Sequence, residues 1–114
     1  MFTVKFIMSR YETDMAHAWI KEEPTLTNME VRNIIRAIDR GWMSERESTA
    51  IKALTGQKFT SAQLAQVLDA VSFDDAKLRV MYATASGLVD CDIELLQESM
   101  SFLSSRSKVA DILL

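Results

Sequence analysis

Apolar residues in the middle of the chain recur at the spacing of an amphipathic helix. Four of them fall at positions i, i+3, i+4 and i+7, which lie on one helical face: Leu64, Val67, Leu68 and Val71. Just before this stripe, Thr60 and Gln63 have the spacing of a capping box, in which two residues exchange hydrogen bonds at a helix start. The pattern predicts a helix that begins after Thr60 and ends at a tight corner over residues 72 to 74.

A second helix is predicted directly after this corner. Asp74 or Asp75 opens it, because a carboxylate at a helix start accepts hydrogen bonds from free backbone amides. The face predicted to point inward carries Leu78, Met81, Tyr82 and Ala85. Val80 falls on another face, so we expect neighbours on both sides of this helix. Residues 59 to 82 therefore predict a helical hairpin.

Weaker copies of this hairpin occur on both sides of it. Toward the N-terminus, Thr27 and Glu30 repeat the capping box, and the stripe returns as Val31, Ile34, Ile35 and Ile38. Toward the C-terminus, residues 101 and 102 repeat the Ser-Phe corner, and the apolar positions are Ile93, Leu96 and Met100. A unit of about 30 residues repeated three times is typical of arrays in which each hairpin packs on the next.

The expected fold is all-α, with about six or seven short helices in antiparallel hairpins that form a repeat-like, right-handed stack. We expect a single domain over residues 1 to 114, with a first helix over residues 9 to 23 and the three hairpins over residues 27 to 114. Ser44 and Glu47 have capping-box spacing and predict a helix that stops near Gly56. The last helix is expected from about Ser104 to the end.

Residues 1 to 8 alternate between apolar and other side chains, a pattern typical of a strand. A lone strand needs partners for its backbone groups, so several interpretations stay open. The segment packs across the helices as an apolar tail, or it begins the first helix, or the chain starts at Met8. Alternatively, Phe2, Val4 and Phe6 pair with the same segment of a second chain and make a homodimer. We favour the tail, because exposed apolar edges are usually covered within the molecule.

The helix expected over residues 28 to 40 carries the best candidate for a binding surface. Three arginines recur every four residues and form one basic ridge, called the arginine ridge below: Arg32, Arg36 and Arg40. Asp39 lies within reach of Arg36, and Gly41 is expected to close the helix in the left-handed conformation. Trp42 follows in the turn. The ridge and Trp42 suit an acidic protein surface or a phosphate backbone; the alternative is a solvated face beside a tryptophan that covers the core.

The chain of 114 residues is 48% hydrophobic and 25% charged, which is ordinary for one globular domain. Its net charge of -3, with the excess of acidic over basic residues in the C-terminal half, argues against nucleic-acid binding. One histidine, His17, and one cysteine, Cys91, cannot form a disulfide framework, a zinc site or a cysteine-histidine catalytic pair. We therefore expect no metal, no cofactor and no enzymatic activity, in a cytoplasmic protein without a membrane span.

Two Ser-Phe corners share a further feature, a basic residue four positions past the phenylalanine. The pairs are Ser72-Phe73 with Lys77 and Ser101-Phe102 with Arg106, and Val89-Asp90 lies between them. With these motifs, residues 27 to 113 resemble the DUF4476 family, a small helical domain of unknown function found mostly in bacterial proteins. The resemblance implies a helical architecture and assigns no activity.

An extended stack of hairpins favours a non-enzymatic protein-interaction module, because its face binds without any catalytic group. The expected partner is another protein or a second copy of this chain. A second hypothesis is nucleic-acid or acidic-partner binding through the arginine ridge. An enzyme is the least favoured, since acids such as Asp74 and Asp75 are better explained as helix caps.

Overall fold

The structure is a computed structural model, and it describes residues 23–114. These residues form six α-helices and two short 3-10 turns, which confirms the all-helical prediction. The elements are α1 Asn28–Arg40, η3 Met43–Glu45, α2 Arg46–Leu54, α3 Ser61–Val71, α4 Asp74–Thr84, η4 Ala85–Gly87, α5 Ile93–Gln97 and α6 Leu103–Leu113. The helix predicted over residues 9 to 23 and the apolar segment with Phe2, Val4 and Phe6 lie outside the described residues, apart from Glu23.

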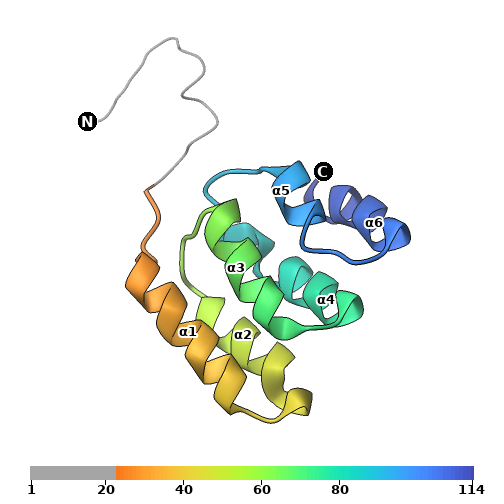
Figure 1. The fold of residues 1–114 in the computed structure, drawn as a ribbon. Helices are drawn as coiled ribbons and strands as arrows, with labels where there is room; N and C mark the ends of the chain where they lie inside the picture. Colours follow the sequence, from red (N-terminus) through yellow and green to blue (C-terminus); the bar gives the residue numbers. More distant parts are fainter. Residues whose placement is uncertain (1–22) are drawn as a thin grey trace, which may run out of the picture.

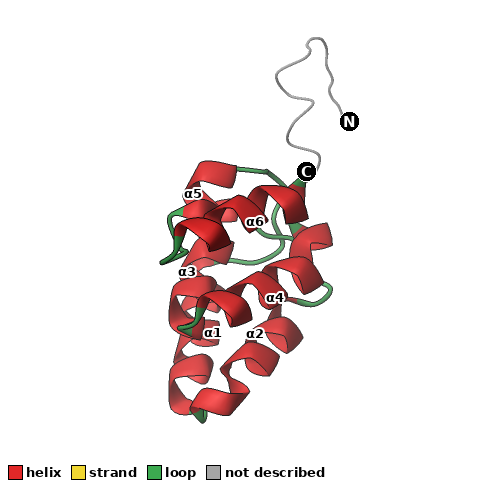
Figure 2. Ribbon diagram, turned by 90° about the vertical axis from the view of Figure 1, so that its right-hand side faces the viewer, coloured by secondary structure: helices red, strands yellow, loops and turns green. Residues whose placement is uncertain are grey.

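Consecutive helices pair into three hairpins, α1 with α2, α3 with α4, and α5 with α6. The hairpins stack so that α1, α3 and α5 follow one another in one layer and α2, α4 and α6 in the other. In Figure 1, the turns that connect the two helices of each hairpin lie toward the lower right. Figure 2 shows the same order of hairpins after a quarter turn. The repeat seen in the sequence is therefore a repeat in space.

Two of the three capping boxes predicted within the described residues form. The backbone N–H of Glu30 donates to Thr27 Oγ1 at 3.1 Å, and the N–H of Thr27 donates to Glu30 Oε1 at 2.8 Å. The same exchange joins Thr60 and Gln63, at 3.1 and 2.9 Å. Each box satisfies two amides that have no partner within the helix. These local bonds fix the starts of α1 and α3 at the predicted residues.

The core runs through the stack between the two layers. The predicted stripe of α3 lies at its centre, and all four residues are buried: Leu64, Val67, Leu68 and Val71. The prediction that Tyr82 faces inward from α4 is wrong, because 76% of its surface is exposed. Lys77 and Thr84 are buried on α4 instead, and each donates to a carbonyl oxygen, Lys77 Nζ to Ser99 at 2.7 Å and Thr84 Oγ1 to Val80 at 2.7 Å. The buried face of α4 therefore includes two hydrogen-bonded polar residues and differs from the face that apolar content alone predicts.

The entry into α2 differs from its prediction. Ser44 and Glu47 form no capping box; the chain passes through the 3-10 turn η3, and Glu45 caps α2 without a side-chain hydrogen bond. The carboxylate of Glu47 accepts two bonds from Arg79 on α4 instead, from Nε at 2.8 Å and from Nη2 at 2.9 Å. Hydrogen bonding to Arg79 lowers the pKa of Glu47. Glu47 therefore pairs with an arginine on the next hairpin instead of capping its own helix.

The glycine that adopts the left-handed conformation is Gly56, with φ of 82°, and not Gly41 as predicted. Gly41 has φ of -81° and an extended backbone, and its N–H donates to the carbonyl of Ile38. The positive φ reverses the chain after α2, where the linker to α3 begins. The chain leaves α1 without such a reversal, through an extended step into η3.

The linkers between hairpins are joined by backbone hydrogen bonds at the end of the stack opposite the corners. The N–H of Phe59 donates to the Gly87 carbonyl and that of Val89 to the Phe59 carbonyl, both at 2.9 Å. In the same way, Thr25 and Leu26 donate to the carbonyl of Lys58. A Cβ atom at Gly87 would lie 2.4 Å from the Gln57 carbonyl oxygen. Glycine is therefore required where these two linkers meet.

Candidate interaction surface

An exposed aromatic residue occupies the same position in each of the three hairpin corners. Trp42, Phe73 and Phe102 each have an extended backbone and immediately precede the second helix or turn of their hairpin. Their exposed fractions are 77%, 63% and 67%. We call the three corners, residues 39–46, 69–77 and 98–106, the corner edge. Figure 1 shows them following one side of the stack.

A basic residue four positions past each aromatic ties the corners together. Arg46 Nη1 donates to the carbonyl of Ala70 at 2.8 Å, and Lys77 Nζ donates to that of Ser99 at 2.7 Å. Both acceptors lie three residues before the aromatic of the next corner, so the two bonds are equivalent. Arg106, in the last hairpin, donates from Nε to the carbonyl of Met100 in its own corner at 3.3 Å. These bonds hold neighbouring corners in register.

The carboxylate of Asp74 adds a second link between the last two corners. The backbone N–H of Ser101 lies 3.0 Å from both of its oxygens, and the N–H of Phe102 donates to Oδ2 at 3.0 Å. Asp74 or Asp75 was predicted to cap its own helix, but α4 has no side-chain cap, and Asp74 bonds to the two amides that precede α6. Burial raises the pKa of Asp74, but the donors at Ser101 and Phe102, with Ser105 and the charge of Lys77, outweigh burial and lower the pKa below its ordinary value of 3.8.

The exposed charges of the corner edge are mostly negative. The exposed acidic residues are Asp39, Glu45, Asp69, Asp75 and Glu98, whereas the exposed basic residues are Arg40 and Arg106. Arg46 is largely covered and Lys77 is buried, and both direct a donor to a carbonyl of the next corner. Met43 and Leu103, next to two of the aromatics, are also exposed. The exposed residues of the corner edge are therefore apolar at three points and more often acidic than basic.

The arginine ridge lies on the surface of α1, as the sequence predicts. Arg32, Arg36 and Arg40 are exposed, and Arg36 Nη1 donates to Asn33 Oδ1 at 3.0 Å. Asp39 forms its ion pair with Arg46 and not with Arg36; its Oδ1 lies 3.6 Å from Arg46 Nη1. Trp42 lies in the adjoining turn and does not cover the core.

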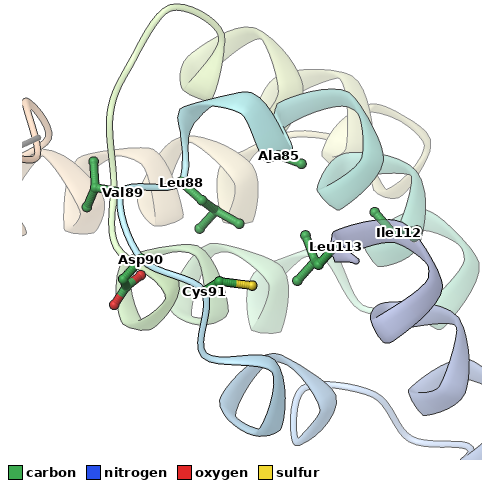
Figure 3. Close-up of a pocket in the computed structure, with 7 residues that line it drawn as sticks. All are labelled: Ala85, Leu88, Val89, Asp90, Cys91, Ile112 and Leu113. Carbon is green, nitrogen blue, oxygen red and sulfur yellow. The ribbon is translucent and has the colours of Figure 1, made fainter. Parts of the chain in front are cut away.

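A shallow hollow of about 250 Å³ lies near the C-terminal end of α6. Figure 3 shows Leu88, Cys91 and Leu113 directed toward it, whereas the carboxylate of Asp90 points away. That carboxylate accepts the N–H of Ser61 at 2.6 Å and so serves the start of α3. Within residues 23–114, no group of three histidine, cysteine or acidic residues is placed to hold a metal ion. The residues that line the hollow include one thiol, that of Cys91, and several apolar side chains.

A family model for a domain of unknown function, DUF4476, matches residues 25–113. The chain belongs to the DUF4476 family. The match begins two residues before the predicted boundary and ends at the predicted one. No curated protein and no solved structure matches the chain. Among the described helices of this DUF4476 protein, none is both long enough and apolar enough to cross a membrane.

Sequence reasoning selected Trp42 but did not place Phe73 and Phe102 beside it on the surface. The signal was present, because an aromatic followed four positions later by a basic residue occurs at Trp42 and Arg46 as well as in the two Ser-Phe corners. Trp42 follows a glycine rather than a serine, so the first corner lacks the Ser-Phe pair that marks the other two. The structure places an exposed aromatic before the second helix or turn of all three hairpins, although only the first corner passes through a 3-10 turn.

Proposed function

We propose that this DUF4476 protein is a non-enzymatic interaction module that binds another protein through the corner edge. One observation carries the proposal: Trp42, Phe73 and Phe102 recur at equivalent positions, and each exposes more than 60% of its surface. Exposed aromatic side chains gain from leaving water, and aromatic anchors dominate the binding energy of many interfaces. Their neighbours Met43 and Leu103 extend the apolar contact area.

Three polar side chains of the first two corners hold neighbouring corners together, which supports a separate task for the aromatics. Arg46, Lys77 and Asp74 bond to the backbone of the following corner. The aromatic rings are left outside this network and outside the buried core of the described residues. A repeat that places large apolar groups in solvent at regular positions presents a binding surface rather than a means of folding.

Selection of peptides from a random display library tests the proposal. Wild-type protein is compared with a triple variant in which Trp42→Ser, Phe73→Ser and Phe102→Ser are combined. Tyr82→Ser is the matched control, because it removes an equally exposed aromatic from α4 outside the corners. We expect the wild-type and the control to enrich the same peptides and the triple variant to lose them. Peptides that bind all three proteins equally, or no enrichment at all, would contradict the proposal.

The arginine ridge supports a second candidate, binding of an acidic partner or of nucleic acid. Its three side chains are exposed and carry positive charge along one side of α1: Arg32, Arg36 and Arg40. Binding of this kind weakens steeply as salt rises. Duplex DNA and a polyglutamate peptide are titrated at low salt against wild-type protein and against a variant with all three arginines changed to glutamine. Equal behaviour of the two proteins would remove this candidate.

A further inference from the structure

The spacing of the corner aromatics is set by the packing of the hairpins. Helices follow one another within each layer, and packed helices have axes about 8–10 Å apart. Trp42, Phe73 and Phe102 occupy the same position in successive hairpins. Neighbouring aromatics are therefore expected at roughly that interval, about 8–10 Å, along the corner edge.

An interval of this size matches one conformation of an extended chain. A polyproline II helix rises about 3.1 Å per residue and has three residues per turn, so the same face returns about every 9 Å. A β-strand covers a similar length in three residues, but its side chains alternate, so residues i and i+3 point to opposite faces. Proline-rich segments are recognised by aromatic side chains in other domains as well, because the ligand is already extended before it binds.

The exposed charges of the corner edge favour a partner that carries positive charge. The exposed carboxylates of the corner edge outnumber its exposed guanidinium groups even without Asp39, which pairs with Arg46: Glu45, Asp69, Asp75 and Glu98 against Arg40 and Arg106. A basic segment gains from this potential both in encounter rate and in register. Single-stranded nucleic acid also stacks on exposed aromatics, but its phosphates would be repelled by these carboxylates.

We propose that the corner edge binds an extended, basic, proline-containing protein segment in the polyproline II conformation. Trp42, Phe73 and Phe102 each contact one turn of the segment, and its lysine or arginine side chains face the acidic residues between them. This inference rests on the proposed function and names the class of its partner.

Defined peptides test the inference by fluorescence anisotropy. The probe is a labelled (Pro-Pro-Lys)4 peptide, which repeats every three residues and is basic. Three matched peptides remove one property each: (Pro-Pro-Glu)4 reverses the charge, (Gly-Gly-Lys)4 removes the preformed conformation, and a shuffled peptide of the same composition removes the period. Oligo(dT) of 12 nucleotides tests nucleic acid. We expect (Pro-Pro-Lys)4 to bind at least about tenfold more tightly than each of the others.

Single substitutions locate the bound peptide on the surface. Trp42→Ser, Phe73→Ser and Phe102→Ser should each weaken binding of (Pro-Pro-Lys)4 by about fivefold or more, whereas Tyr82→Ser should leave binding unchanged. Circular dichroism confirms that every variant is folded. Since all four side chains are largely exposed, loss of folding is not expected to interfere.

The outcomes separate this inference from the proposed function. Library peptides that need the corner aromatics but are neither basic nor rich in proline would overturn the inference and leave the proposed function in place. Binding of oligo(dT) that depends on the aromatics would overturn it in the same way. If neither library peptides nor (Pro-Pro-Lys)4 depend on the corner aromatics, both proposals are wrong.

Discussion

The carboxylate of Asp74 lies between two corners and holds the second one in place. It is buried, and it accepts hydrogen bonds from the backbone of Ser101 and Phe102. Sequence reasoning placed the same side chain at the start of its own helix, because a local pattern cannot show an amide that lies 27 positions further along the chain. At the scale of single residues, short-range caps are predictable and long-range caps are not.

Asp74→Asn should destabilise the protein by about 2 kcal/mol at neutral pH, because the charged acceptor is replaced by a neutral one. The folded-state pKa of Asp74 is below its ordinary value of 3.8, so its stabilising effect is complete above the unfolded-state pKa. That effect is lost as the pH falls through the folded-state pKa. Urea denaturation at several pH values should show a constant gap between variant and wild-type above about pH 5, and a narrowing gap below about pH 4.

Asp111→Asn is the control for this measurement, because it changes an exposed carboxylate on α6. We expect its stability at neutral pH to remain within about 0.5 kcal/mol of the wild-type value. A gap between Asp74→Asn and wild-type that is the same at pH 7 and at pH 3 would show that the carboxylate is not the stabilising group.

At the scale of elements, the sequence predicts what is determined within one helix. The capping boxes of α1 and α3 and the apolar stripe of α3 depend on residues three or four positions apart, and both are confirmed. Two of the failures depend on other hairpins: the carboxylate of Glu47 pairs with Arg79, and the buried Lys77 donates to Ser99 while Tyr82 faces solvent. In both, a polar residue has its partner 32 or 22 positions away.

Glycine substitutions test whether two linkers approach closely at Gly87 but not at Gly41, where α1 ends. Gly87→Ala should destabilise the protein by about 2 kcal/mol or more, because the added Cβ would lie 2.4 Å from the Gln57 carbonyl oxygen and 2.6 Å from the ring of Phe59. Gly41→Ala is the matched control, since its Cβ meets nothing closer than 3.6 Å and its φ is -81°. Its effect should stay within about 0.5 kcal/mol. Thermal or urea denaturation measures both, and equal effects would contradict the close approach of the two linkers.

At the scale of the whole molecule, the repeat was visible in the sequence but its surface was not. The period of the apolar stripe predicts a stack of three hairpins, and the stack is observed. The alignment of Trp42, Phe73 and Phe102 depends on the corners being equivalent in space. The arginine ridge needed no tertiary information, because four-residue spacing within α1 determines its face.

The triple variant Trp42→Ser, Phe73→Ser and Phe102→Ser should fold and keep nearly the stability of the wild-type protein. Each of these rings leaves most of its surface in water in the folded state, so little apolar burial is lost. We expect a change of less than about 1 kcal/mol in the free energy of unfolding. A loss comparable to that of a core substitution such as Leu68→Ala, about 2–5 kcal/mol, would show that the aromatics serve folding instead of binding.

The two ends of the hairpins are held by different kinds of bond. Backbone hydrogen bonds join the linkers, whereas long side chains of Arg46 and Lys77 span the gap from one corner to the next. A long side chain reaches its acceptor through several rotatable bonds, whereas a backbone pair has no such freedom. Thermal bending of the stack should therefore change the distances between neighbouring corners more than the distances between neighbouring linkers. A partner bound to the corner edge would then adjust the distance between the aromatics while the linkers keep their pairing.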